Sequence, residues 1–430
     1  MRYVYTIVFT LTFLLLGAAA WLMPGMSNST SIAEAAHTEP SILRRQAIAF
    51  YERRLTEDPQ SALDMAQLAA LFMEEGRMAG DERAFVVAES LARKSLGERT
   101  RRNGRSAALL TNALLAQHRF AEADSVAREL VNTEPDQPAY RALLAETAME
   151  LGDYDDAIRQ LGSIRARRED LGIAPRYARW AELTGRTAEA RRILQKARAD
   201  ARLRGDLTGE QRAWFSLRLA DVELRHGNLR SAGSAIRDGL KESPNDWRLV
   251  LWRARLEAAR GQWKRSIGSA EEVLAHVSSP DALALLATAH RQLGRDDDAT
   301  AFEVALEQVA LSKPGTVHRS WAMTLLDKGS NDERLLALAV ADTLVRHDLY
   351  TLDLLAWALY RTGRAAEALP VMRRAMSTKP NEASVRYHAA MIEFAAGDAA
   401  VGEEHRRVAL GRGKALTRAQ VRELRAASGN

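Results

Sequence analysis

Hydrophobic residues along most of the chain recur with the spacing of a helix face. In residues 349–380, the apolar positions of one such face are Leu352, Leu355, Ala356 and Leu359. Intervals of three and four residues place them on the same side of an α-helix. Gly363 can adopt the positive φ of a tight helix exit, and Pro380 can end a second helix. The segment is therefore predicted to form two helices joined by a tight turn.

This pattern of helix, turn and helix returns about every 34 residues. The predicted turn positions are Gly76, Gln117, Gly152, Gly185, Gly227, Gly261, Gly294, Gly329, Gly363 and Gly397. Seven of the nine intervals between neighbouring turns measure 33–35 residues. The two longer steps suggest an expanded turn at residues 76–81 and a longer second helix or exit loop at residues 197–211. A fixed period of this kind indicates stacked hairpins, since a single hairpin cannot bury its apolar face.

The clearest unit, Leu349 to Pro380, resembles the tetratricopeptide repeat family. It contains the run DLLAWALYRTGRAAEAL at residues 353–369, followed by Ala375 and Pro380. The resemblance extends in register over ten units, roughly residues 41–415. It implies an all-α fold, a right-handed α-solenoid of about ten helix hairpins. Two units depart from the family pattern at Gln117 and Arg334, and these hairpins are expected to be locally distorted.

Helices are also predicted at the two ends of the array. Residues 41–56 read as an unpaired N-terminal helix. Residues 416–430 read as a polar C-terminal capping helix around Val421 and Leu424, because the last repeat of a solenoid needs a polar outer face.

The N-terminus is predicted to direct export. Tyr3 to Met23 is a 21-residue, mostly apolar run without charge, preceded by Arg2. This is close to the roughly 20 residues that span a bilayer, and the placement of basic residues predicts that the following chain is exported. Residues 1–23 are read as a signal peptide or a transmembrane anchor, and residues 24–40 as a flexible linker.

Two interpretations of this segment as an export signal stay open. A third alternative is that it forms a buried core helix. Its length favours an uncleaved anchor, because the apolar part of a signal peptide is usually about 7–15 residues. The other interpretation is a signal peptide cleaved at the A-x-A site that ends at Ala35. The predicted location is thus a membrane-anchored periplasmic repeat domain, or a secreted protein if cleavage occurs.

Composition and motifs narrow the possible functions. The absence of cysteine excludes disulfides, thiolate metal sites, a thiol nucleophile and a lipobox. A net charge of +5 over 430 residues does not indicate nucleic-acid binding. No Walker loop, nucleophile elbow or HExxH motif occurs. We therefore predict a protein that is not an enzyme and has no cofactor, catalytic residue or metal site.

Three charged segments could suggest otherwise. The acidic runs at residues 153–156 and 296–298 lack the later oxygen ligands of a calcium loop, and are read as N-caps and as favourable partners of the helix dipole. Residues 164–204 hold twelve basic residues against five acidic ones. That segment is either a solvated face or a docking patch for an acidic partner or lipid headgroups.

In tetratricopeptide repeat proteins, the first helix of each hairpin lines the concave binding groove. The resemblance therefore implies candidate groove residues in the matching register, chosen because aromatic and arginine side chains are enriched at binding hot spots. They are Arg176, Arg179, Arg218, Asp221, Trp252, Arg255, Asp353, Trp357, Tyr360, Arg361, Tyr387 and Met391. The alternative for Trp252 and Trp357 is packing between adjacent hairpins.

The sequence thus predicts an extracytoplasmic, membrane-tethered scaffold that binds protein or peptide partners through a concave groove, without nucleic acid. The alternatives are an accessory subunit or spacer in an envelope complex, or an enzyme whose site is not recognised.

Overall fold

The computed structural model describes residues 39–312, 318–329 and 333–427. Two compact units divide the chain, residues 1–45 and 46–430. The described part of the first unit is the beginning of helix α3 (Glu39–Glu57). The predicted anchor at residues 1–23 and nearly all of the linker lie outside the described residues. Among the helices that the structure describes, none is both long and apolar enough to span a membrane.

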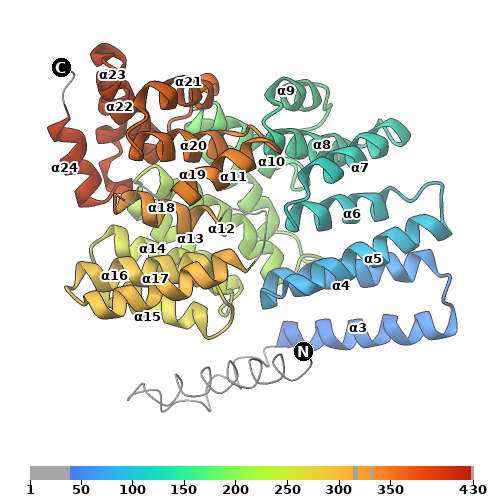
Figure 1. Ribbon diagram of the computed structural model, residues 1–430. Helices are drawn as coiled ribbons and strands as arrows, with labels where there is room; N and C mark the ends of the chain where they lie inside the picture. The colour runs from blue at the N-terminus through green and yellow to red at the C-terminus, as the bar shows by residue number, and fades with distance from the viewer. Residues whose placement is uncertain (1–38, 313–317, 330–332, 428–430) are drawn as a thin grey trace, which may run out of the picture. The chain divides into compact units, whose positions relative to one another are not determined.

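Residues 46–430 form an all-α solenoid of stacked helical hairpins, as predicted (Figure 1). We number the hairpins 1 to 10 along the chain. Their first helices are α4 (Ala62–Ala79), α6 (Gly104–Ala116), α8 (Pro138–Leu151), α10 (Ala174–Leu183), α12 (Gly209–Arg225), α14 (Trp247–Ala259), α16 (Pro280–Gln292), α18 (Arg319–Asp327), α20 (Leu349–Arg361) and α22 (Ala383–Ala395). Their second helices are α5 (Glu82–Glu98), α7 (Phe120–Thr133), α9 (Tyr154–Gly162), α11 (Thr187–Arg202), α13 (Leu229–Glu242), α15 (Trp263–Leu274), α17 (Asp296–Leu311), α19 (Glu333–Thr343), α21 (Ala365–Ala375) and α23 (Ala399–Gly411). The 3₁₀ turns η1 (Met376–Thr378) and η2 (Gly413–Ala415) and a last helix, α24 (Arg418–Ala426), complete the described elements.

Small residues let the two helices of a hairpin approach each other. Ala356 and Ala368 of hairpin 9 are fully buried, as are Ala145 and Ala157 of hairpin 3. Eight of the ten predicted turn positions are glycines with φ between 71° and 89°. Only a residue without a Cβ atom adopts this backbone without cost, which explains the regular spacing of glycine along the chain.

The first two turns differ from the prediction. Gly76 lies inside α4, and the left-handed residue that ends this helix is Gly80, with φ 64°. A glycine is needed at position 76 for a different reason, because a Cβ atom there would lie 2.6 Å from the Phe85 ring. In hairpin 2, His118 next to Gln117 takes the left-handed conformation, with φ 59°. A local distortion was predicted for this hairpin, and it takes the form of a non-glycine residue in a strained backbone conformation.

The two long steps have different causes. The expanded turn predicted at residues 76–81 is wrong, because α4 continues as a helix to Ala79. Long helices α4 and α5 and the link at residues 99–103 account for that step. The second prediction is confirmed, because α11 extends to Arg202 and an exit link follows at residues 203–208.

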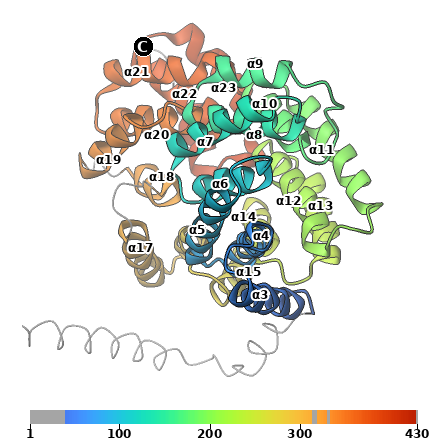
Figure 2. The same ribbon diagram turned by 90° about the vertical axis from the view of Figure 1, so that its right-hand side faces the viewer.

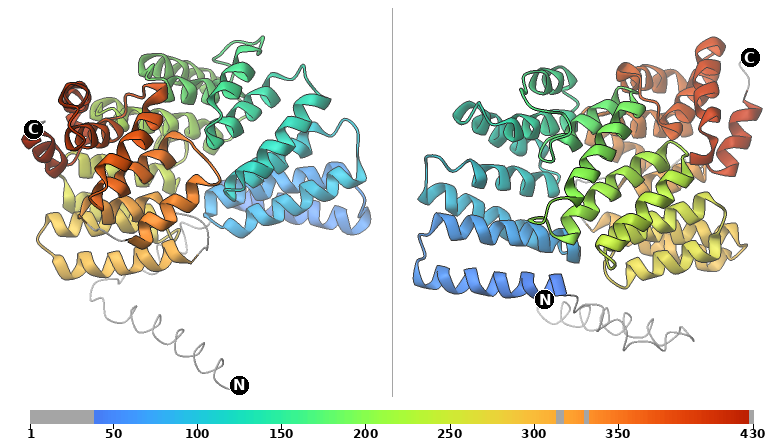
Figure 3. Two further views of the ribbon diagram at one scale, coloured as in Figure 1. Left: turned by 45° about the horizontal axis from the view of Figure 1, so that its top comes forward. Right: turned by 180° about the vertical axis from the view of Figure 1, so that it is seen from behind.

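The solenoid of residues 46–430 returns on itself, so that distant hairpins touch. The backbone N–H of His347 donates to the Leu151 carbonyl oxygen at 2.9 Å, and the backbone N–H of Leu349 donates to Tyr154 Oη at 2.7 Å. Asn381 Nδ2 donates to the Gly185 carbonyl oxygen at 2.7 Å. Figures 2 and 3 show the corresponding helices, α8–α10 in green and α20–α22 in orange and red, beside one another. Hairpins 3 and 4 therefore contact the beginnings of hairpins 9 and 10, which neighbour-only stacking does not produce.

Candidate functional site

The structure places the twelve predicted groove residues on the first helices, but much of that face is buried. Asp221, Asp353, Trp357, Tyr387 and Met391 are each less than 9% exposed. The other seven residues are half-buried. Trp357 is fully buried and stacks on His388, with ring centroids 4.2 Å apart. It therefore packs inside the fold, as the alternative interpretation proposed.

The arginines of the predicted groove are engaged with carboxylates. Their nitrogen-to-oxygen distances are Arg176–Glu146 2.7 Å, Arg179–Glu150 2.8 Å, Arg218–Asp221 2.9 Å, Arg255–Asp281 2.9 Å and Arg361–Glu423 3.5 Å. Four of these five pairs join first helices or lie within one. Trp252 is half-buried and lies under the Arg255 guanidinium, 4.6 Å from the ring centroid. The inner face is thus largely occupied by its own ion pairs.

One ion network crosses the inside of the solenoid. Arg225 at the end of α12 donates to Asp221 at 2.8 Å and lies 3.2 Å from Glu182. Its other Nη atom donates to Tyr350 Oη of α20 and lies 3.4 Å from Glu382, the residue before α22. Tyr350 Oη in turn donates to Glu382 at 2.9 Å. This network connects hairpins 4 and 5 to hairpins 9 and 10.

Burial and charge act in opposite directions on this network. Burial raises the pKa of Glu182. Burial also acts to raise the pKa of Asp221, but the charges of Arg225 and Arg218 outweigh it and hold that pKa below its usual value. Burial raises the pKa of Tyr350 well above that of free tyrosine, so its hydroxyl stays protonated and can donate. The charges of this network are therefore balanced by one another across the inside of the solenoid.

An open cavity remains where the first helices of hairpins 1 to 6 face one another. It has a volume of about 400 Å³. Its lining consists of Glu74, Arg77, Met78, Asn112, Glu146, Leu171, Arg176, Glu210, Gln211, Trp214, Phe215 and Arg248. Of the twelve predicted residues, Arg176 is the one that lines it. We call this the inner cavity.

Local structure fixes the side chains around the inner cavity. Thr208 begins α12 with a capping box in which its side chain accepts from the backbone N–H of Gln211. Gln211 Nε2 donates to Glu74 at 3.1 Å, which connects α12 to α4. Half-buried Trp214 lies one turn further along and meets Phe215 edge to face, with ring centroids 5.2 Å apart. The cavity thus offers one aromatic wall and several polar groups in fixed positions, a combination that can hold a side chain or a short peptide.

Sequence reasoning missed most of this cavity. Trp214 precedes Arg218 by four residues, so both lie on the same side of α12. That spacing could have added Trp214 to the predicted set. The pairing of Gln211 with Glu74 joins residues 137 positions apart, and no local pattern indicates it.

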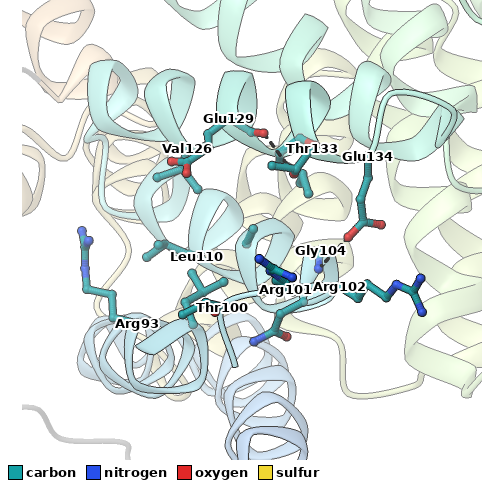
Figure 4. Close-up of a pocket in the computed structure, with 14 residues that line it drawn as sticks. Arg93, Thr100, Arg101, Arg102, Gly104, Leu110, Val126, Glu129, Thr133 and Glu134 are labelled. Carbon is teal, nitrogen blue, oxygen red and sulfur yellow. Dashed lines mark hydrogen bonds between the residues drawn. The ribbon is translucent and has the colours of Figure 1, made fainter. Parts of the chain in front are cut away.

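A second cavity opens between α5, α6 and α7, outside the predicted groove (Figure 4). Its volume is about 620 Å³. Leu96, Leu110 and Val126 supply apolar lining, while arginines and Glu134 lie around it. The backbone N–H of Gly104 donates to Glu134 Oε1 at 3.1 Å. Because the lining carries both signs of charge, it does not favour a ligand of one charge.

The Arg-rich segment at residues 164–204 is mostly neutralised internally. Eleven of its twelve basic residues lie within 4.0 Å of a carboxylate, and Arg165 is the exception among them. Examples are Arg191 with Glu223 at 2.6 Å and Arg192 with Glu169 at 2.7 Å. This pairing favours the interpretation as a structured, solvated face.

The two acidic runs behave differently from each other. Asp153 is the N-cap of α9 and accepts from the backbone N–H of Asp156 at 3.0 Å, as predicted. The N-cap of α17 is Arg295 and not an aspartate, so that part of the prediction is wrong. Asp296, Asp297 and Asp298 instead occupy the first turn of α17, where the helix dipole favours negative charge.

Comparison with known proteins bears on the same regions. Sequence models of the tetratricopeptide repeat match residues 114–179 and 217–276. A relative, cellulose synthase operon protein C of Pseudomonas fluorescens (strain SBW25), is 26% identical over 266 residues, which are 61% of this chain and 19% of that protein. The chain therefore spans about a fifth of the length of the curated relative that it matches.

Similar solved structures cover long stretches at low identity. PilW, a type IV pilus biogenesis factor, is 19% identical with a TM-score of 0.40, over 52% of this chain and 99% of that one. Human IFIT1, solved as a dimer with PPP-AAAA, is 14% identical with a TM-score of 0.46, over 89% of this chain and 91% of that one.

Proposed function

Since the chain is a tetratricopeptide repeat protein, we propose that it is an extracytoplasmic, membrane-tethered scaffold that binds a protein partner in the inner cavity. The observation that carries this proposal is the cavity itself, which the first helices of hairpins 1 to 6 surround, with half-buried Trp214 on its wall. Exposed aromatic and arginine side chains are the usual anchors of a protein interface. The proposal assigns no catalytic residue.

The partner is proposed to enter as an extended or helical segment. Asn112, Gln211 and Glu210 present amide and carboxylate groups that can bind peptide backbone or polar side chains, while Trp214 and Met78 can contact an apolar side chain. Ion pairs hold Arg176 and Arg248 in place, to Glu146 at 2.7 Å and Asp246 at 2.6 Å. Such preorganised groups lose little entropy on binding.

A Trp214→Ala variant tests the assignment. We expect partners that are recovered with the full-length protein from membranes after crosslinking in intact cells to be lost with this variant. Trp263→Ala is the matched control, because Trp263 is also half-buried but lies on a second helix outside the cavity. Recovery of the same partners with Trp214→Ala would overturn the assignment of the cavity. Reproducible turnover by the purified protein would favour an enzyme.

The membrane tether is a separate part of the proposal. It rests on the uncharged run from Tyr3 to Met23 after Arg2, whose length matches the roughly 20 residues of a membrane-spanning helix. We expect the protein isolated from membranes to keep this segment, which mass measurement of the intact chain will show. A mature chain that begins after Ala35 would contradict the anchor and support secretion.

A second candidate function is a spacer or accessory subunit in an envelope complex. The contacts between hairpins 3–5 and 9–10 favour it, because they stiffen an array that would otherwise bend between repeats. Native mass spectrometry in mild detergent separates the two functions. A stoichiometric complex that survives Trp214→Ala indicates the spacer, whereas a monomer indicates transient docking.

A further inference from the structure

Besides the paired segment at residues 164–204, a second excess of basic residues lies in residues 406–430. Residues 406–430 contain seven basic residues and one acidic residue, whereas residues 1–405 contain 54 basic and 55 acidic residues. This second excess lies on the end of α23, η2 and α24. Arg418, Arg422 and Arg425 form its outermost part, and all three are exposed.

These three arginines form one stripe along α24. They are four and three residues apart, so their side chains leave the same side of the helix. Within the described residues, none of the three has a carboxylate or hydrogen-bond partner. Many arginines of the repeats are instead paired with a carboxylate, for example Arg364, which pairs with Glu367 at 2.6 Å. We call Arg418, Arg422 and Arg425 the arginine stripe.

The opposite side of α24 holds the helix firmly on the solenoid. Leu424 is fully buried, and Gln420 Nε2 donates to Asp327 Oδ2 at 3.2 Å. Tyr387 donates to Glu423, and Arg406 Nη1 donates to the Ala427 carbonyl oxygen at 2.7 Å. The stripe is therefore presented on a helix whose position is fixed before any partner arrives.

Local stability does not explain the stripe. Arg418 occupies the first position of α24, where the positive end of the helix dipole disfavours a cation. A polar cap could equally use uncharged or acidic side chains there. Three neighbouring unpaired cations also repel one another.

We infer that the arginine stripe binds an acidic segment of a partner protein. Each guanidinium can hold a carboxylate through two parallel hydrogen bonds, and the spacing of the stripe matches carboxylates on consecutive turns of a helix. A membrane surface fits less well, because a helix that lies on lipid needs a free apolar face. The apolar residues of α24 are half-buried Val421 and buried Leu424. This surface lies apart from the inner cavity and does not depend on its assignment.

The test uses full-length protein in phosphatidylcholine nanodiscs and a defined probe. The probe is a labelled helical peptide of about 18 residues, long enough to form a helix, with glutamate on consecutive turns of one face. Its binding is followed by fluorescence anisotropy at about 50 mM and about 300 mM salt, because exposed charge pairs are screened by salt. A peptide with glutamine in place of each glutamate is the control ligand.

We expect the acidic peptide to bind, and the variant Arg418→Gln/Arg422→Gln/Arg425→Gln to bind it at least about tenfold more weakly. The matched control is Arg102→Gln/Arg165→Gln/Arg237→Gln, which removes the same charge from three other exposed arginines and should change the affinity less than about twofold. Equal weakening by both variants would reduce the effect to net charge and overturn the inference. A failure of the acidic peptide to bind would also overturn the inference. The same holds if the stripe variant loses binding to phosphatidylglycerol vesicles but still binds the peptide.

Discussion

At the scale of single residues, the inner face of this solenoid shows how one side chain can stabilise the fold where a ligand site was expected. Asp353 is fully buried, and its carboxylate accepts from His388 Nδ1 at 2.8 Å and pairs with Arg319. Burial acts to raise the pKa of Asp353, but His388 and Arg319 outweigh it and lower the pKa to about 2. The residue belongs to the folded core and not to an accessible groove.

The first prediction concerns Asp353→Asn. Breaking a buried ion pair leaves Arg319 without its partner, so we expect a loss of about 3 kcal/mol in the free energy of unfolding at pH 7. The folded pKa lies below the unfolded value, so the contribution of Asp353 is complete above about pH 4 and is lost toward pH 2. Urea unfolding between these pH values will show the advantage of the wild type shrinking. A constant difference would contradict the assigned pKa.

The second prediction compares two tryptophans of the predicted groove. Trp357→Ala removes a fully buried ring, and we expect a loss of about 3–5 kcal/mol in unfolding free energy. Trp252→Ala removes a half-buried ring that lies under Arg255, and we expect about 1–2 kcal/mol. Chemical denaturation measures both. Similar small losses would mean that Trp357 is more accessible than the structure indicates.

At the scale of elements, the hairpin turns serve two different purposes. Every turn needs a left-handed residue to end its first helix, and glycine supplies it in most hairpins. In hairpins 3 and 4 the same glycines also allow a distant segment to approach. A Cβ atom on Gly152 would lie 2.4 Å from the backbone of His347, and one on Gly185 would lie 2.5 Å from the Lys379 carbonyl oxygen. A Cβ atom on Gly363 would meet no other part of the protein within 4 Å, apart from its chain neighbours.

The third prediction uses this difference. Gly363→Ala carries only the cost of a positive φ, which is about 1 kcal/mol in unfolding free energy. Gly152→Ala has the same φ cost and must in addition displace the segment at His347, so we expect a further loss of about 2 kcal/mol. Thermal and urea unfolding of the two variants provide the comparison. Equal losses would show that hairpin 3 does not pack on the link before α20.

At the scale of the molecule, contacts across residues 46–430 connect repeats that are far apart in the sequence. One continuous core cluster runs from Ala142 to Leu424. It includes residues of hairpins 3 to 5 and of hairpins 9 and 10. Arg225 adds a polar connection from α12 to Tyr350 and Glu382. Hairpins 4 and 5 should therefore unfold together with hairpins 9 and 10, and not with sequence neighbours alone.

The fourth prediction tests this coupling by amide hydrogen exchange. Arg225→Ala should accelerate exchange in α12 and also in α20 and the start of α22, by roughly 30-fold if about 2 kcal/mol is lost. Arg218→Ala is the control, because Arg218 pairs only with Glu182 and Asp221 on α10 and α12 among the described residues. Its effect should stay within hairpins 4 and 5. Confinement of the Arg225→Ala effect to the same hairpins would exclude the coupling.

The repeat architecture could be predicted from local sequence because its causes are local. Helical spacing of apolar residues, small residues between paired helices and glycine at the turns all act within one hairpin of about 34 residues, and stacking follows from the apolar faces that remain. Two local predictions were wrong. Gly76 is small because of the Phe85 ring and not because of a turn, and α17 begins without a capping aspartate.

The binding surface could not be predicted in this way, because it depends on which first helices face solvent after the solenoid closes. The register correctly placed Trp357, Tyr387 and Asp353 on first helices, yet all three are buried, and their partners lie on adjacent helices of the array. The inner cavity stays open where α4 faces α12 and α14. The hydrogen bond from Gln211 to Glu74 joins α12 to α4 beside it. The sequence by itself determined the hairpins and their order, since these arise from neighbouring residues. Only the tertiary structure decided which parts of the inner face are filled by ion pairs and which stay open, because some partners, such as Tyr350 for Arg225, come from repeats far apart in the sequence.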